Sequence, residues 1–277
     1  NDRGLSRKHL TESVHKSLKR FGTDYVDIFF CHRFDEETPL EETIRTLDDL
    51  IHQGKILYWG TSMWNAANIN DGVATARLIN AVAPVVEQPE YNMLDRAFVE
   101  GGLETALANH GLSMVVWSPL AQGILTGKYN DGSKEMQPIL VERMYRGITT
   151  AATALQPEPI GSVRWTTAEI LPPPDPRWDA EAILEQIAIP AGSRYETVDW
   201  FKNHLTEEKL VKARAISALA QEMGTSSAAL AIAWTLKNPL VASAITGATR
   251  PTQIDENLKA LDVVITPEIN ERIEEIL

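Results

Sequence analysis

Polar and aromatic side chains stand at the ends of five short apolar runs in this chain of 277 residues. They are His32, Ser62, Gln88, the pair Trp117 and Ser118, and the turn that holds Gly247 and Thr249. An imidazole, an amide and a large aromatic ring that meet at one mouth suit carbonyl chemistry with a flat, bound cofactor. The sequence lacks the clustered His and carboxylate residues of a metal hydrolase, so we predict no metal site. The G-x-S-x-G elbow of a serine hydrolase is also absent.

Each of these residues also has an ordinary structural explanation. His32 could be a hydrogen-bond donor within the fold, Trp117 could pack in the core, and Gln88 could satisfy backbone groups. The turn from Gly247 to Pro251 opens a helix, whose free N–H groups attract phosphate, but it could equally be a plain strand-to-helix connection. The spacing alone therefore supports a pocket at a rim, with room for a phosphate, and no named reaction.

Strand and helix patterns alternate along most of the chain, and they must position these residues. The runs with the length and composition of strands are 25–31, 56–62, 84–88, 114–117 and 241–245. The helical patterns cover 7–20, 40–54, 66–79, 95–111, 206–223 and 227–237, then a short helix from Pro251 and a terminal one from Pro267. Thr38 and Glu41 predict a capping box with Pro39 at the first helical position.

Strands separated by helices need crossover connections, so the sheet should be parallel and the fold class α/β. An open doubly wound nucleotide fold would carry a G-x-G-x-x-G turn after its first strand, and the sequence has none. We therefore predict a (β/α)₈ TIM-type barrel. At about 30 residues per βα unit, the first three units would need roughly 90 further residues, and the barrel lacks them here.

A Pro-rich stretch, which includes Pro172-Pro173-Pro174, interrupts the alternation. It could be a lid over the active site or a solvated insertion. We therefore divide the chain into central barrel units at 1–132, an atypical insertion at 133–188, and the last barrel units with the C-terminal helix at 189–277.

The charge balance excludes several classes of partner. The chain has 26 basic and 38 acidic side chains and a formal net charge of −12, which argues against nucleic acids and anionic membrane surfaces. No apolar run approaches the roughly 20 residues that cross a bilayer, so we predict no membrane insertion. Cys31 is the single cysteine, which excludes an intrachain disulfide and favours the reducing cytoplasm. Because the first residue is Asn1, we expect a longer parent chain.

Several motifs, in one order, resemble the aldo-keto reductase superfamily, in particular the branch of the voltage-gated potassium-channel β subunits and their bacterial oxidoreductase relatives. The resemblance covers about 1–132 and 189–277. Its motifs include Asp24-Tyr25-Val26-Asp27, His32-Arg33-Phe34-Asp35, Trp59-Gly60-Thr61-Ser62, Glu87-Gln88-Pro89-Glu90-Tyr91-Asn92, Trp117-Ser118-Pro119-Leu120-Ala121-Gln122-Gly123, Thr126-Gly127-Lys128-Tyr129 and Gly247-Ala248-Thr249-Arg250-Pro251-Thr252-Gln253 with Glu256-Asn257.

The resemblance implies a barrel that binds NADP(H) and reduces aldehydes and ketones by hydride transfer. His32 matches the family's catalytic histidine, which orients and polarises the carbonyl oxygen. The resemblance assigns the carboxamide to Ser62 and Gln88, the nicotinamide ring to Trp117, the pyrophosphate to Ser118, Pro119, Leu120 and Gln122, charge neutralisation to Lys128 and Arg194, and the adenosine end to Gly247, Thr249, Gln253, Glu256 and Asn257. Arg250 becomes the partner of a 2′-phosphate.

The sequence departs from the family in four places. The family's catalytic tyrosine, lysine and aspartate match no residue here, because the chain begins just after the expected lysine. Residues 133–188 lie where relatives run directly on. Phe34 replaces a more usual proline, and Met63 replaces a polar residue. Channel subunits often carry asparagine where this chain has His32, which favours the enzymatic relatives.

We therefore predict an NADPH-dependent reductase of small carbonyl compounds, read as a partial chain. The alternatives are a cofactor-binding regulatory subunit like the channel β proteins and a catalytically inactive fragment with open barrel edges. We expect the chain alone to reduce no aldehyde. The sequence does not specify the substrate, and a homo-oligomer is possible because this branch includes tetramers.

Overall fold

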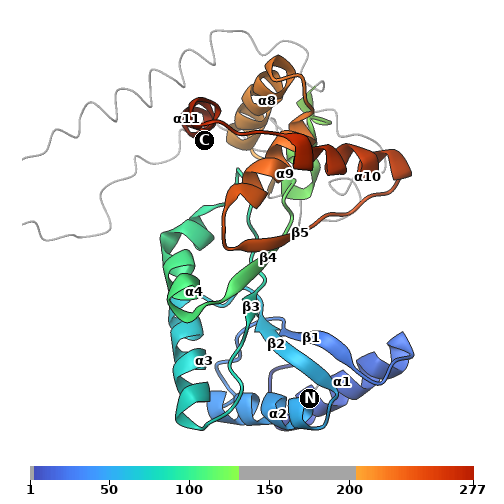
Figure 1. Ribbon diagram of the computed structural model, residues 1–277, viewed down its shortest axis with the longest axis vertical. Coiled ribbons are helices and arrows are strands. Elements are labelled where there is room, and N and C mark those ends of the chain that lie inside the picture. The colour runs from blue at the N-terminus through green and yellow to red at the C-terminus, as the bar shows by residue number, and fades with distance from the viewer. Residues whose placement is uncertain (1–2, 131–203) are drawn as a thin grey trace, which may run out of the picture. The chain divides into compact units, whose positions relative to one another are not determined.

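The computed structural model describes residues 3–130 and 204–277, and its centre is a parallel sheet (Figure 1). The strands pair in sequence order: β1 (Val26–Cys31), β2 (Ile56–Thr61), β3 (Val86–Glu87), β4 (Ser113–Trp117) and β5 (Val241–Ile245). Every neighbouring pair is parallel, as predicted. Over the described residues the sheet is not closed, and β1 and β5 form its two edges.

Helices connect the strands in the predicted order. They are α1 (Arg7–Phe21), α2 (Leu40–His52), α3 (Ala66–Leu78), α4 (Glu104–His110), α8 (Glu207–Glu222), α9 (Ser227–Lys237), α10 (Pro251–Leu258) and α11 (Pro267–Ile276). Three shorter helical segments are η1 (Val99–Leu103), η2 (Ala121–Thr126) and η5 (Lys259–Asp262). None of the helices in the described part of the chain is both long enough and apolar enough to span a membrane.

Local signals set the ends of most helices. The Ser6 hydroxyl accepts a hydrogen bond from the His9 N–H at the start of α1, and Gly22 ends this helix at a φ of 69°. Thr266 caps α11 in the same way through the Ile269 N–H.

The predicted capping box before α2 is wrong. Pro39 is the N-cap residue itself and makes no side-chain cap. The Thr38 hydroxyl donates instead to the Asp35 carboxylate at 2.7 Å, which also accepts the backbone N–H groups of Leu5 and Glu37. The loop after β1 is therefore organised by Asp35, and the hydrogen bond from Thr38 holds the pKa of its carboxyl below the ordinary value.

The predicted helix from Asp95 to Gly111 is interrupted. A π-helical turn, η1, precedes the shorter α4, and Gly102 within it has a φ of 122°. Glycine adopts this angle at little cost, so the helix can break at Gly102. The spacing of the apolar residues is the same on both sides of the break, which is why the sequence pattern predicts one continuous helix.

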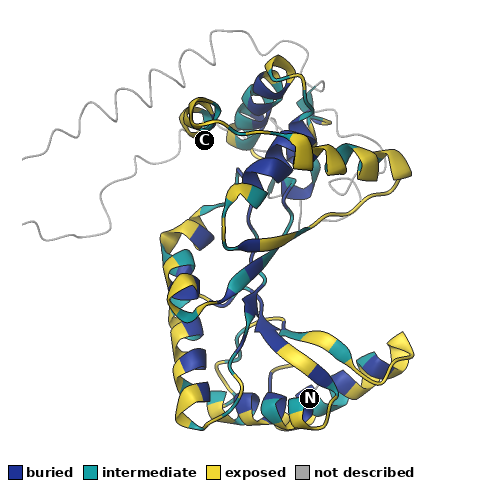
Figure 2. Ribbon diagram, viewed as in Figure 1, coloured by how far each residue is buried: buried dark blue, intermediate teal, exposed yellow. Residues whose placement is uncertain are grey.

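Buried residues lie on the strands and on most of the helices; α9 is buried along nearly its whole length, and α10 has no buried residue (Figure 2). Ile44, Leu47 and Leu50 of α2 are buried, and Trp59 of β2 is buried with its indole N–H donating to the Val82 carbonyl at 2.8 Å. In α1 the buried residues Leu10, Val14 and Leu18 are spaced four apart, which is the amphipathic arrangement that the sequence period predicts.

The chain divides into two compact units. One contains residues 1–127 and 208–277, including the whole sheet, and the other contains residues 128–207. The predicted insertion at 133–188 lies outside the described residues, so its boundaries and the choice between lid and solvated segment stay predictions.

Candidate active site

The predicted site residues follow strands whose carboxyl ends share one edge of the sheet. The register pairs Cys31 with Thr61, Thr61 with Glu87, and Trp117 with Ile245, each at the last position of its strand. His32, Ser62, Gln88 and Ser118 are therefore the first residues beyond this edge, where parallel barrels carry their active sites.

Hydrogen bonds join the segments that contain Ser62 and Gln88. The Ser62 N–H donates to the Cys31 carbonyl at 3.0 Å, and the Ser62 hydroxyl donates to the Gln88 carbonyl at 2.9 Å. The Gln88 N–H donates to the Thr61 carbonyl at 2.8 Å. Ser62 is buried and Gln88 is half-buried, so these two predicted carboxamide residues occupy one fixed corner.

Sequence reasoning did not single out Glu87, which lies beside this corner with no exposed surface. Its carboxylate accepts hydrogen bonds from the Thr61 hydroxyl and from the Trp64 N–H, the latter at 3.2 Å. Burial raises the pKa of Glu87 to about 7, against the lowering effect of the Thr61 hydrogen bond. The sequence does offer one signal for Glu87: an acidic residue stands inside the apolar run that forms β3, and acidic residues are rarely buried without a partner.

His32 lies at the carboxyl end of β1 and is exposed. Its backbone carbonyl accepts a hydrogen bond from the Arg33 guanidinium at 2.8 Å. The imidazole therefore stands where solvent or a substrate can reach it, one residue beyond the Cys31 carbonyl that binds Ser62.

The backbone of Trp117 continues the edge beyond β4. Its N–H donates to the Pro89 carbonyl at 3.0 Å, and its carbonyl accepts the Tyr91 N–H at 3.4 Å. The segment after Gln88 thus pairs with the end of β4, which brings Trp117 and Gln88 to neighbouring positions at the same edge. Trp117 is half-buried.

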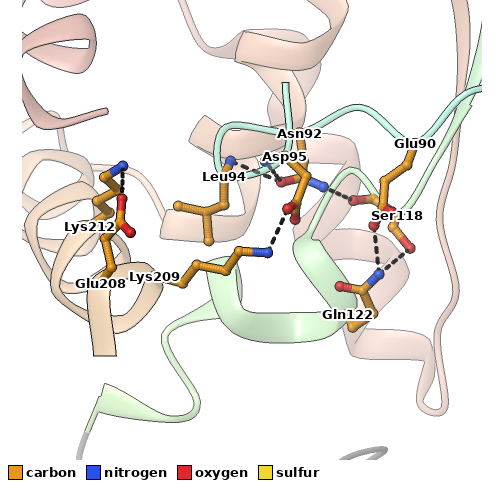
Figure 3. A network of polar contacts seen from close by, with 9 residues as sticks. All are labelled: Glu90, Asn92, Leu94, Asp95, Ser118, Gln122, Glu208, Lys209 and Lys212. Carbon is orange, nitrogen blue, oxygen red and sulfur yellow. Dashed lines mark hydrogen bonds and ion pairs between the residues drawn. The ribbon is translucent and has the colours of Figure 1, made fainter. Parts of the chain in front are cut away.

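A polar network surrounds the turn after Trp117 (Figure 3). The Gln122 amide donates to Glu90 at 2.7 Å and to the Ser118 hydroxyl at 3.2 Å. The Asn92 amide donates to the Ser118 carbonyl at 3.1 Å. Gln122 is only 8% exposed, and its Oε1 atom is buried without a hydrogen-bond partner.

This turn has a strained backbone. Ser118, Ala121 and Gln122 all have positive φ angles, of 54°, 46° and 56°. Residues other than glycine rarely adopt this region, and such strain gathers at ligand sites. Pro119 is buried, and Leu120 packs against the cluster formed by Ile232, Ala233 and Ala260.

The turn between β5 and α10 is held by one side chain of the helix. The Gln253 Oε1 atom accepts the Thr249 N–H at 2.7 Å and the Arg250 N–H at 3.2 Å. Gly247, Thr249 and Arg250 are exposed. The N–H groups predicted to meet a phosphate therefore already have an internal acceptor.

The remaining predicted cofactor residues are less closely connected. A hydrogen bond from Lys259 lowers the pKa of Glu256 on α10, and Asn257 is half-buried on the same helix. Lys128 belongs to the second unit, where its ammonium lies 4.9 Å from the centre of the Tyr129 ring. Arg194 lies outside the described residues. In the described part of the chain, no group of three or more His, Cys, Asp or Glu side chains could hold a metal ion.

Sequence reasoning also left Glu90, Asn92 and Asp95 without roles. The buried Asn92 side chain accepts the N–H groups of Leu94 and Asp95, each at 2.9 Å, and Asp95 pairs with Lys209 of α8 (Figure 3). Asn92 thereby anchors the loop that carries Glu90 toward Gln122. The Asn92 turn is local, within three residues, whereas the contacts of Asp95 with Lys209 and of Gln122 with Glu90 join distant parts of the sequence and have no local pattern that predicts them.

Comparison with known proteins gives a consistent answer. The model of the aldo/keto reductase family matches residues 1–277. A probable voltage-gated potassium channel subunit beta of Arabidopsis thaliana is 38% identical over 283 residues, which cover 100% of this chain and 69% of that protein. The corresponding protein of Oryza sativa subsp. japonica gives the same identity and coverage. A putative voltage-gated potassium channel subunit beta of Schizosaccharomyces pombe is 38% identical over 279 residues, or 100% of this chain and 66% of its own.

Proposed function

The chain belongs to the aldo/keto reductase family, and from this premise we propose that it is an oxidoreductase that reduces small aldehydes or ketones with NADPH. Family membership makes the five parallel strands part of a (β/α)₈ barrel, which is not closed over the described residues. The observation that carries the proposal is the hydrogen-bonded corner of Ser62 and Gln88, with Trp117 next to it at the same edge.

The donor set of this edge fits a nicotinamide cofactor. A carboxamide needs both a donor and an acceptor, and a hydroxyl and a primary amide side chain each offer both. The Trp117 indole offers an aromatic face for a flat ring. The buried Oε1 atom of Gln122, which has no hydrogen-bond partner, is a further acceptor beside the strained turn. We therefore assign the carboxamide to Ser62 and Gln88 and the nicotinamide face to Trp117.

When bound, NADPH supplies a hydride to the carbonyl carbon of the substrate. His32 would orient the carbonyl oxygen and donate a hydrogen bond to it, which stabilises the negative charge that develops there. The proton that completes the alcohol would come from the family's tyrosine, which the resemblance implies and which matches no residue of this chain. Ser62 and Gln88 fix the angle of the nicotinamide ring, and Trp117 covers one face of it and excludes water. Each of these roles is positional and would be lost with its side chain.

The rest of the cofactor would extend along the same edge. Within the first unit, Ser118, Pro119, Leu120 and Gln122 would follow the pyrophosphate. The resemblance adds Lys128 and Arg194 as residues that would neutralise charge. Gly247, Thr249, Gln253, Glu256 and Asn257 hold the adenosine end. The exposed Arg250 guanidinium binds the 2′-phosphate, which would make NADPH the preferred nucleotide.

The test is a fluorescence titration of the chain with NADPH. We expect Trp117→Ala to weaken binding roughly tenfold, while Trp117→Phe, which keeps an aromatic face, loses much less. Arg250→Ala should weaken NADPH binding severalfold and leave NADH binding unchanged. Equal affinity of the wild-type chain and the Trp117→Ala variant would contradict the stacking role.

A second function has support from the relatives, whose names describe potassium channel β subunits. In this reading the chain binds the cofactor and acts as a regulatory subunit with little or no turnover. The deciding assay uses the longer parent chain expected above, because this chain alone should reduce no aldehyde. Oxidation of NADPH by that parent that depends on an added aldehyde would favour the reductase. Tight NADPH binding with no such oxidation would favour the regulatory subunit.

We also propose the cytoplasm as the compartment and a homo-oligomer as a possible assembly. The one cysteine, Cys31, is a buried free thiol, and burial raises its pKa to about 12, so it is suited to a core and not to disulfide exchange. The net charge of −12 supports small-molecule substrates over nucleic acid.

A further inference from the structure

Glu87 is the one acidic side chain in the described part of the chain that has no exposed surface. A carboxylate in the core is costly unless several donors satisfy it. A valine or leucine at the end of β3 would fill the same space more cheaply. The position therefore calls for an explanation in terms of what the carboxylate binds.

The side-chain hydrogen bonds of Glu87 go to the last residue of β2 and to the turn that follows it. The Thr61 hydroxyl donates to Oε2, and the Trp64 N–H donates to Oε1 at 3.2 Å. The Met63 backbone N–H also acts on the carboxylate and lowers its pKa. Met63 has a φ of 56°, a conformation that a methionine adopts only when its surroundings hold it there. The buried carboxylate thus holds a strained turn whose first residue is Ser62.

Glu87 is also adjacent in sequence to Gln88, and the Ser62 hydroxyl binds the Gln88 carbonyl. The Glu87 side chain therefore binds residues on both sides of Ser62 and is itself adjacent to Gln88, so it is placed to fix both residues assigned above to the carboxamide. We propose that Glu87 is a positioning residue for the cofactor, which holds Ser62 and Gln88 in the geometry that the carboxamide requires. The proposal rests on the proposed function, because it concerns the same site.

The carboxylate form is the one that accepts several donors at once, so the turn should depend on pH. Thr61 and the two backbone N–H groups are neutral, and the charged group that acts on Glu87 is Arg33, in the loop after β1. Protonation of Glu87 removes acceptor capacity from the turn. Cofactor affinity should therefore weaken as Glu87 takes up its proton.

The experiment uses the full chain and NADPH at about pH 8 and about pH 6. At about pH 8 we expect Glu87→Gln to weaken NADPH binding roughly tenfold. The wild-type affinity should fall severalfold more than that of the variant between the two pH values, because titration of the cofactor's own phosphate affects both equally. Glu104→Gln, which changes a carboxylate on α4 that accepts from Asn238, is the matched control and should bind like the wild type.

A pair of variants at Thr61 separates positioning from loss of folding. Thr61→Ser keeps the hydroxyl donor to Glu87 and should retain an affinity close to that of the wild type. Thr61→Val keeps the size and removes the donor, and it should weaken NADPH binding about as much as Glu87→Gln. Melting curves identify any variant whose fold is lost.

Amide hydrogen exchange tests the turn without any cofactor. In the wild-type chain the Met63 and Trp64 amides should exchange slowly, and Glu87→Gln should speed both by roughly tenfold or more. Unchanged exchange, or a Glu87→Gln variant that binds NADPH like the wild type at both pH values, would overturn the positioning role. If the wild-type chain binds neither NADPH nor NADH, the proposed function fails, and the exchange rates still decide whether Glu87 holds the turn.

Discussion

Two turns at the carboxyl edge of the sheet are each held by side-chain oxygens that bind backbone N–H groups. After β2 the acceptor is the Glu87 carboxylate, which is charged when ionised and fully buried. Before α10 the acceptor is the Gln253 amide, which is neutral and lies beside exposed residues. The two turns therefore use the same hydrogen-bond geometry in opposite surroundings.

The surroundings determine what each turn can do. Water or a phosphate oxygen can replace the Gln253 oxygen, because its partners Thr249 and Arg250 are at the surface. Glu87 has no exposed surface, so water or a ligand can replace its carboxylate only if β2 and β3 move apart. In the proposed site the nicotinamide end would thus be rigid and the adenosine end adaptable, a contrast that variants can test.

The largest effect should be the pH dependence of stability that Glu87 causes. Burial raises the pKa of this carboxyl from its ordinary value of 4.5 to about 7 in the folded chain. The folded chain then holds this proton more tightly than the unfolded chain. The stability gained is fully present below the unfolded pKa and is lost as the pH rises through about 7.

Urea unfolding at a series of pH values measures this effect. Relative to the Glu87→Gln variant, the wild-type free energy of unfolding should fall by on the order of 3 kcal/mol between about pH 4.5 and about pH 8. Parallel pH profiles for the two proteins would contradict the raised pKa. Stability and cofactor affinity would then change in opposite directions with pH, as expected for a site that trades stability for function.

A smaller effect should come from a methyl group added at Gly60 in β2. A Cβ atom there would stand 2.6 Å from the Val86 side chain, 2.7 Å from the Val86 carbonyl and 2.9 Å from the Phe30 ring. The carbonyl belongs to β3 and cannot move without breaking the sheet. Gly60→Ala should therefore lower the free energy of unfolding by about 2 kcal/mol.

Gly247→Ala, in the turn between β5 and α10, is the matched control, because nothing lies within 4 Å of the Cβ atom that it adds. It should change stability by less than about 0.5 kcal/mol. Chemical denaturation of both variants provides the comparison. If both variants lost a similar free energy of unfolding, the β5–α10 turn would be as tightly packed as β2 at Gly60.

Local signals explain the parts of the fold that the sequence predicts. Ser6 and Gly22 bound α1 through contacts within four residues of the helix end, and the five strand patterns match the five strands. The capping box at Thr38 fails because Asp35 competes for the same hydroxyl. The helix from Asp95 fails at Gly102, whose positive φ has no signature in the apolar period.

The sequence predicts the site only through the rule that active-site residues follow the carboxyl ends of parallel strands. That rule places Ser62 and Gln88 at one edge, and the structure joins them by a hydrogen bond. Glu87 and Thr61 are 26 residues apart, and Gln122 and Glu90 are 32 apart, so their pairing depends on tertiary packing. The roles of His32 and the cofactor residues stay predictions, since the family shows the chemistry and not the individual contacts.

Removal of the Gln253 side-chain oxygen, which accepts hydrogen bonds in the turn between β5 and α10, should have a modest effect on stability. Gln253→Ala leaves the Thr249 and Arg250 N–H groups to water and should cost about 1 kcal/mol, as for loss of an N-terminal cap. Thr252→Ala, at an exposed neighbouring position, should change stability by less than about 0.5 kcal/mol. Thermal melting of both variants tests this, and equal melting temperatures would show that the Gln253 hydrogen bonds contribute nothing.

The smallest predicted effect is the most direct test of the contrast between the two turns. A carboxyl group in the β5–α10 turn should have a lowered pKa, whereas burial raises the pKa of Glu87. Gln253→Glu places a carboxylate at an exposed helix N-terminus, where the N–H groups and the helix dipole favour the charged form. Its pKa should be lowered, so the variant should gain about 0.5 kcal/mol over the wild type above about pH 5 and lose it as the pH falls. The same charge would repel a bound phosphate, so NADPH affinity should fall severalfold while stability rises. Unfolding curves and NADPH titrations of the same samples measure both quantities. A variant that is more stable and binds NADPH as tightly as the wild type would show that the adenosine end of the cofactor lies elsewhere.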